Sequence, residues 1–264
     1  SQRWMVSVLR ANLALLQGRL PEAERSATQA KDLGARSRLT EAEEHFASHT
    51  YFIRTEQSRP VEALDLVQDA AERFTWYPFF RCELANLHLQ LGDERASRVV
   101  YEELAADRFG ALPRDNEWIF ALTLLSPLSV RHDDLEGASI LYELLLPFAD
   151  RLAVGHSEGS TGSVARALGI VATGLSRFDD AEKHFAFAIE HNERMGARLW
   201  TTDTQVCFAR MLFARDAPGD RERAHALLND ALRTCRSLDL VRLEAEIREL
   251  RPEIEDVYQQ GERF

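Results

Sequence analysis

The segment LGIVATGLSRFDDAEKHFAFAI, residues 168–189, decides the fold of this chain. Its second half places Ala181, Phe185, Ala188 and Ile189 four, three and one residues apart, so that all four side chains lie on one face of a helix. A short polar stretch separates this apolar stripe from the apolar residues that precede it. The segment therefore predicts two helices joined by a turn.

The same phrase occurs five more times, as a polar or turn-forming stretch, one or two charges, an alanine and an apolar helical stripe. The other copies are QGRLPEAERSATQA, QSRPVEALDLVQDA, LGDERASRVVYEEL, HDDLEGASILYELL and APGDRERAHALLNDAL. The six alanines follow one another at steps of 40, 33, 42, 43 and 43 residues, at Ala23, Ala63, Ala96, Ala138, Ala181 and Ala224. This period is typical of stacked helix pairs. The small side chain lets the two helices of a pair approach closely.

Strand signals are scarce, since the chain has only 13 glycines and eight prolines and contains no NG, DG or GG dipeptide. We therefore expect an all-α fold, a right-handed α-solenoid of stacked antiparallel helix pairs that forms one domain over residues 1–264. The expected pairs span residues 4–35, 40–73, 77–107, 114–150, 162–195 and 200–237, and a C-terminal capping helix spans 239–260.

Prolines indicate where several of these helices begin. Pro21, Pro60 and Pro218 each lie beside the start of a helix that carries one of the six alanines, where the missing N–H is not needed. Pro127 and Pro252 fall inside helical patterns, and we expect them to kink or split those helices.

Residues 168–189 resemble a tetratricopeptide repeat (TPR). The Leu168–Gly169 pair, Phe178, Ala181, Phe185 and Ala188 match preferred positions of that repeat, and residues 84–96 and 13–23 match it more loosely. Most steps exceed the usual 34 residues of the repeat, so the resemblance implies a variant with longer helices.

A narrower resemblance covers the C-terminal two thirds of the chain. The phrases ELAADRFGALPRDNEWIFALTLL, ILYELLLPFADRLAV, GSVARALG and FARMLFARDAPGDRERAHALLNDAL are similar to the C-terminal repeat region of large bacterial regulators. Those regulators combine a signal-transduction ATPase module with a LuxR-type or SARP-type DNA-binding domain or a class III adenylate/guanylate cyclase domain. The resemblance implies a sensor and interaction arm without chemistry of its own. The chain contains no GxxxxGK[ST] phosphate loop, so ATP, DNA and cyclase functions would belong to other parts of such a regulator.

Composition limits the partners and the location. Apolar residues make up 45% of the 264 residues, and 43 acidic against 32 basic residues give a formal net charge of -11. This charge repels nucleic acid and anionic lipid. Three widely spaced cysteines and the lack of a secretory or membrane-spanning segment favour the cytoplasm. Because the first residue is Ser1 rather than Met, we expect a processed chain or a piece of a longer protein.

The sequence Gly155-His156-Ser157-Glu158-Gly159 satisfies the G-x-S-x-G pattern of a hydrolase nucleophile elbow. That elbow requires a parallel sheet, which the repeats do not provide, so we expect a loop between two helix pairs and keep a Ser157 hydrolase only as an alternative. The chain is accordingly predicted not to be an enzyme.

The same loop precedes a helix whose free N–H groups are suited to an anion, with Arg166 shortly downstream. A phosphate or carboxylate ligand is one hypothesis for this segment. The other is a solvent-exposed connection in which Ser160, Thr161 or Ser163 caps the helix.

No metal or cofactor site is expected. His45 and His49 share a helical face at the spacing of metal ligands, but no third ligand is evident, and the same applies to His184 and His191. The acidic runs, such as residues 41–44, lie at helix beginnings, where the helix dipole favours negative charge.

The apolar residues of the last segment step by three and four, an a/d pattern formed by Leu240, Leu243, Ile247, Leu250, Ile254 and Val257. Two interpretations stay open. The stripe either caps the last repeat or pairs two chains in a homodimer through the C-terminal helix.

Matching positions to the tetratricopeptide repeat gives a set of candidate contacts on the concave face. These are Phe52, Phe79, Asn86, Arg166, Ile170, Thr173 and Arg210; the loop adds Gly155, His156, Ser157 and Gly159. We expect the groove to bind a protein, a peptide or a small inducer as part of a larger transcriptional or signalling regulator. A free-standing scaffold or adaptor is the competing interpretation.

Overall fold

Helices follow one another in pairs along the computed structural model, which describes residues 2–155 and 159–251. The pairs are α1 (Gln2–Leu16) with α2 (Leu20–Ser37), α3 (Glu41–Glu56) with α4 (Val61–Arg73), α5 (Phe79–Gln90) with α6 (Glu94–Phe109), α7 (Trp118–Arg131) with α8 (Leu135–Leu145), α9 (Val164–Gly174) with α10 (Phe178–Arg194), and α11 (Arg198–Arg215) with α12 (Asp220–Leu238). The last helix is α13 (Val241–Leu250), and a short 3-10 helix, η1 (Leu146–Phe148), follows α8. The predicted all-α class is confirmed.

The small residue that anchors each second helix is buried against its neighbours. Five of the six predicted alanines are at most 1% exposed: Ala23, Ala63, Ala138, Ala181 and Ala224. In α6 the prediction is wrong by one residue, since Ala96 is only half-buried and Ser97 is fully buried. The side chain of Asp93 accepts a hydrogen bond from the Ala96 N–H and caps α6, so that the fourth residue of this helix, Ser97, faces inward.

The turns inside the first five pairs share one geometry. Two residues after the first helix, the chain takes a positive φ between 56° and 81°, at Gly18, Ser58, Gly92, Asp133 and Ser176. The next residue donates its N–H to the carbonyl five residues earlier, at 2.8 to 2.9 Å, as Arg19 does to Ala14. This is the Schellman arrangement, which satisfies carbonyls left free at a helix end. The repeat seen in the sequence is therefore also a repeat of turn geometry.

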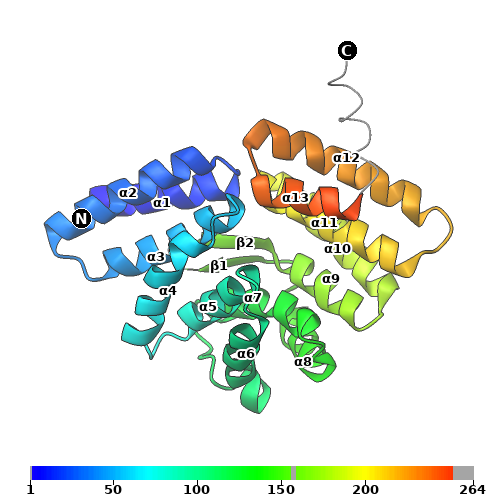
Figure 1. The fold of residues 1–264 in the computed structure, drawn as a ribbon, viewed down its shortest axis with the longest axis horizontal. Helices are drawn as coiled ribbons and strands as arrows, with labels where there is room; N and C mark the ends of the chain where they lie inside the picture. Colours follow the sequence, from blue (N-terminus) through cyan, green and yellow to red (C-terminus); the bar gives the residue numbers. More distant parts are fainter. Residues whose placement is uncertain (1, 156–158, 252–264) are drawn as a thin grey trace.

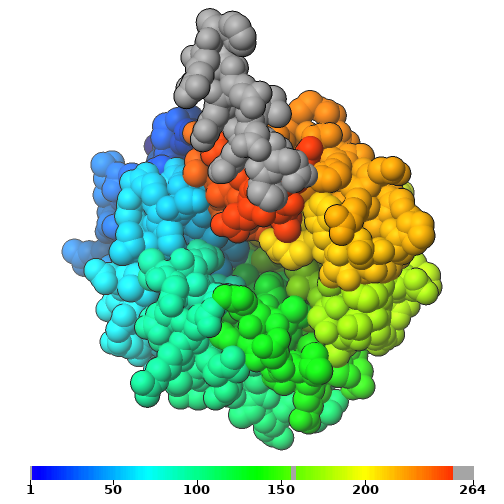
Figure 2. Space-filling model, turned by 45° about the vertical axis from the view of Figure 1, so that its right-hand side comes forward, coloured from blue at the N-terminus to red at the C-terminus, as the bar shows by residue number. Residues whose placement is uncertain are grey.

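The pairs follow one another around a ring (Figure 1). Its two ends meet where α1 contacts α11 and where α13 contacts α3. Figure 2 shows α13, in red, between the cyan α3–α4 segment and the yellow and orange C-terminal helices. Leu240, Leu243 and Ile247 are buried there within the same chain, which makes them unavailable for pairing two chains. Ile254 and Val257 lie outside the described residues.

A β-hairpin crosses the inside of this ring, where the sequence predicts only a loop. Strands β1 (Leu152–Gly155) and β2 (Gly159–Ser163) pair antiparallel and contact helices α1, α7, α9, α10 and α11. Gly162, with φ 74°, passes so close to Trp200 that an added Cβ would lie 2.6 Å from the Trp200 Cβ. Such a short, Gly- and Ser-rich strand is held by its surroundings, and this explains why local sequence does not predict it.

Helix α7 continues through Pro127, so of the two expected effects of this proline the splitting of the helix does not occur. Its apolar residues are buried on several sides, with Phe120, Leu122, Leu125 and Leu128 fully enclosed. Burial of this kind stabilises the helix enough to outweigh the tendency of proline to interrupt it. Pro252 lies outside the described residues. One hydrophobic cluster extends from Ala11 to Ile247, and a smaller one joins Trp4, Val8, Ala30 and Ala42. Among the helices described, none has the length and apolar character to cross a membrane.

The shared turn makes opposite predictions at two equivalent positions. Ser176→Gly should stabilise the fold by about 1 kcal/mol, because a left-handed conformation strains a residue with a side chain and glycine removes that strain. The greater entropy of glycine in the unfolded chain offsets part of the gain. Gly92→Ser should destabilise it by about as much, since no atom lies within 4 Å of an added Cβ and only backbone strain is introduced. Urea midpoints measure both, and shifts of the same sign would contradict the shared geometry.

Candidate functional site

The two phenylalanines predicted to line the concave groove are buried in the core. Phe52 is 6% exposed and Phe79 is 1% exposed. Both stack on Phe120, with ring centroids 5.9 and 5.1 Å away, and so connect α3, α5 and α7. Their surface is used by the core and is not open to a ligand.

Three further groove candidates also have partners within the fold. The Asn86 side-chain amide donates to backbone carbonyls of α5 and α7, at 2.8 and 3.1 Å. The Thr173 hydroxyl donates to the Gly169 carbonyl at 2.7 Å, and Ile170 is half-buried against the main core. The Asn86 amide thus joins α5 to α7, whereas the Thr173 bond lies within α9.

The predicted groove arginine Arg166 belongs to a buried ionic cluster. Its guanidinium bonds to one carboxylate oxygen of Asp203 at 2.7 Å, and Arg242 bonds to the other at 2.8 Å. Arg242 also donates to both oxygens of Glu56 at 2.9 to 3.1 Å. Burial alone would raise the pKa of Asp203, but Arg166 and Arg242 together lower it to about 2. Four elements, α3, α9, α11 and α13, are joined by this cluster.

Arg210, the remaining groove candidate, lies at the exposed edge of the same region. It pairs with Glu246 at 3.0 Å, and Glu246 also bonds to Arg242 at 2.6 Å. Of the seven predicted groove residues, Phe52 and Phe79 thus belong to the core, Arg166 and Arg210 to ion pairs, and the other three are half-buried.

The predicted loop motif falls at the turn of the hairpin. Gly155 and Gly159 end the two strands, while His156 and Ser157 lie outside the described residues. An added Cβ on Gly155 would lie 2.9 Å from a carboxylate oxygen of Glu117 and 2.6 Å from the Phe120 ring. The strands on either side are antiparallel, unlike the parallel sheet of a nucleophile elbow.

The predicted side-chain cap of α9 is absent. Ser163 occupies the N-cap position, but its hydroxyl lies 3.3 Å from His191 Nδ1 and caps no N–H. The Thr161 and Thr123 hydroxyls bond to each other at 2.7 Å, and the Ser160 hydroxyl donates to the Ala153 carbonyl. The Thr161 and Ser163 hydroxyls thus connect the hairpin to α7 and α10, while the Ser160 hydroxyl joins its two strands.

The predicted histidine pairs lie in different surroundings. His45 stacks on Trp4 at 5.2 Å between ring centroids, and His49 Nε2 lies 2.6 Å from Asn12 Oδ1. His184 Nε2 lies 3.0 Å from the Tyr142 hydroxyl. Within residues 2–155 and 159–251, no group of three or more His, Cys, Asp or Glu side chains is placed to hold a metal ion.

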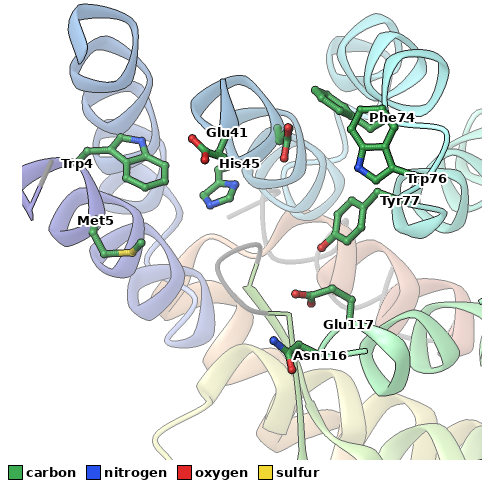
Figure 3. A pocket seen from close by; sticks show the side chains of 10 residues that line it. Trp4, Met5, Glu41, His45, Phe74, Trp76, Tyr77, Asn116 and Glu117 are labelled. Atoms are coloured by element: carbon green, nitrogen blue, oxygen red, sulfur yellow. The ribbon is translucent and has the colours of Figure 1, made fainter. Parts of the chain in front are cut away.

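An open cleft of about 480 Å³ lies at the edge of the ring where the first helices of several pairs begin (Figure 3). We call it the aromatic–acidic cleft. It is lined by Trp4 and Met5 of α1, by Glu41, Glu44 and His45 of α3, by Phe74, Trp76 and Tyr77 of the α4–α5 connection, and by Asn116 and Glu117 before α7. Four segments separated in sequence therefore build it.

The walls of the cleft combine aromatic faces with carboxylates. Trp4 and Met5 lie on one side and Phe74, Trp76 and Tyr77 on the other, with Glu41 between the two walls and Glu117 below Tyr77 (Figure 3). Trp76 is 72% exposed, the largest exposed fraction of any large apolar side chain in the described part of the chain. Its ring meets Phe74 edge-on at 5.6 Å. An aromatic side chain held out at an open cleft is typical of a recognition surface.

Sequence reasoning missed this cleft. The acidic run at residues 41–44 was interpreted only as a helix start, which it also is. One signal was available, since FTWYPFF, residues 74–80, carries five aromatic residues in seven where a connection between two helix pairs is expected. No protein-family model, curated protein or solved structure matches the chain.

The ionic cluster predicts a sharp contrast between two arginines of α13. Arg242→Met should destabilise the fold by about 3–5 kcal/mol, because it leaves Glu56 and Asp203 buried without that counter-ion. Arg248→Met, which removes an exposed pair with Glu244, should change stability by less than about 1 kcal/mol. Urea unfolding measures both changes in stability. Equal effects would show that the buried cluster contributes no more to stability than an exposed ion pair does.

The burial of His49 predicts an acid sensitivity. Burial, and secondarily the charge of His45, lower the pKa of His49 to about 3, so the folded state keeps it neutral while the unfolded chain binds a proton below pH 6.5. The free energy of unfolding should therefore fall by about 1.4 kcal/mol for each pH unit below 6.5 through this residue. His49→Gln should flatten that part of the pH profile between pH 6.5 and 4. A variant profile parallel to the native one would contradict this.

Proposed function

We propose that the chain is a non-catalytic recognition module, a TPR-like right-handed α-solenoid that binds a peptide or a small inducer in the aromatic–acidic cleft. In this proposal it is the sensor and interaction arm of a larger bacterial regulator that carries an ATPase module. The resemblance of its repeat phrases to such regulators supports the second part, and the cleft supports the first.

The observation that carries the proposal is the cleft with Trp76 held out beside it. The β-hairpin occupies the interior where helical repeats would otherwise offer a concave groove, and the predicted groove residues are engaged in the core and in ion pairs. The cleft, by contrast, is open, and its volume of about 480 Å³ lies within the roughly 300–1,000 Å³ typical of small-ligand sites.

The position of the cleft also suits a sensor. Its lining comes from α1, α3, the α4–α5 connection and the segment before α7. A ligand that contacts all four segments would favour one relative arrangement of the first helix pairs over others. It would shift the parent protein only by its difference in affinity between the two states.

A ligand screen with one variant tests the recognition part. Compounds and peptides that raise the melting temperature of the native chain should lose most of that effect in Trp76→Ala. They should keep it in Val99→Ala, which removes an exposed apolar side chain of α6 outside the cleft. Ligands that stabilise all three proteins equally would place binding elsewhere. The regulator part is tested by the coding sequence upstream of Ser1, where an ATPase module should lie in the same reading frame.

A further inference from the structure

The lining of the aromatic–acidic cleft has a marked charge imbalance. Among the described residues that line it, three are glutamates and none is lysine or arginine. The protein has 32 basic residues, and one of them pairs with a carboxylate of α3 close to the cleft. Glu43, between two of the cleft glutamates in sequence, accepts a hydrogen bond from Arg73 at 2.8 Å.

Glu41 is the carboxylate of the cleft that most clearly lacks a paired cation among the described residues. It lies in the first turn of α3 and faces the cleft, and no cation of the described chain pairs with it. A neutral or anionic occupant would remove water from this carboxylate without supplying a counter-ion, which is unfavourable. A positively charged occupant would supply one.

The aromatic walls of the cleft also favour a positively charged occupant. The π faces of tryptophan and tyrosine carry negative potential and attract cations, most strongly when water is displaced. Trp4 and Trp76 lie on opposite sides of the opening, and Tyr77 lies beside Trp76 with its hydroxyl end toward Glu117 (Figure 3). Trp4 is buried and stacks on His45. A cation in the cleft therefore meets mainly the exposed ring of Trp76 and the neighbouring Tyr77.

The occupant should be organic. The described carboxylates and His45 do not form a group that could hold a metal ion. Hydrated metal ions also gain little from Met5 and the aromatic walls, whereas an alkylated ammonium or a guanidinium brings apolar surface together with its charge. The volume of about 480 Å³ admits such a group with the frame that carries it.

We infer that the aromatic–acidic cleft binds an organic cation, an ammonium or guanidinium group on an apolar frame. The inference rests on the proposed recognition function and specifies its ligand class. A free amine and a basic side chain of a peptide share this chemistry, and the probes below separate them.

Isothermal titration of the whole chain tests the inference with two matched pairs of probes. Choline is compared with its neutral isostere 3,3-dimethylbutan-1-ol, and an acetylated, amidated Ala-Arg-Ala peptide with the same peptide carrying citrulline. Binding of a cation and at least about tenfold weaker binding of its neutral counterpart are expected. The cation that binds more tightly identifies a free amine or a peptide side chain as the source.

Four variants locate the binding. Trp76→Ala should weaken the preferred cation about tenfold, and Glu41→Gln about fivefold. Glu43→Gln, which removes a neighbouring charge that pairs outside the cleft, and Val61→Ala, which trims an exposed apolar residue, should bind as the native chain does. Both cleft residues are exposed, so the variants should fold, and circular dichroism checks this.

The outcomes separate this inference from the proposed function. Equal binding of charged and neutral probes that is lost in Trp76→Ala would overturn the cation inference and leave recognition at the cleft in place. Cation binding that is equal in all four variants would show only attraction to the net negative charge and overturn it as well. Absence of binding by every cation would overturn it too, while the ligand screen of Trp76→Ala would still decide the proposed function.

Discussion

Arg242 joins the two ends of the chain. It bonds to Glu56, 186 residues away in sequence, and to Asp203, which in turn holds Arg166. Burying several charges is unfavourable unless each is paired, and here each carboxylate accepts bonds from at least one guanidinium. At the place where the two ends of the ring meet, this ionic cluster lies beside the buried apolar residues Leu240, Leu243 and Ile247 of α13. Packing and paired charges together hold the row of helix pairs in a ring.

The hairpin and the cleft both follow from this closure. Because α1 meets α11 and α3 meets α13, the space inside the ring is bounded on all sides, and the hairpin is held there by hydroxyl and amide contacts such as Thr161 with Thr123 and Ser163 with Asn192. The hairpin thus occupies part of the interior of the ring. The aromatic–acidic cleft, where we propose recognition, lies open at the edge of the ring near the starts of α1, α3 and α7.

The sequence predicts what depends on neighbours along the chain and misses what depends on distant ones. Periodic alanines predict the helix pairs because each buries its small side chain within its own pair; the error at Ala96 arises because the Asp93 cap sets the register of α6. The hairpin escapes prediction because β1 and β2 are fixed by contacts with five helices. The cleft escapes it because its residues come from four segments, although the aromatic run at residues 74–80 marks one of its walls.

The closed ring also fixes how many repeats the protein can have. In an open array each repeat contacts only its neighbours, so that copies can be gained or lost during evolution with little effect on the others. Here α13 must reach α3 with Arg242 opposite Glu56, and the removal of one helix pair would rotate the two ends out of register. The number of helix pairs in this protein is therefore tied to the closure of its ring, as it is not in an open array.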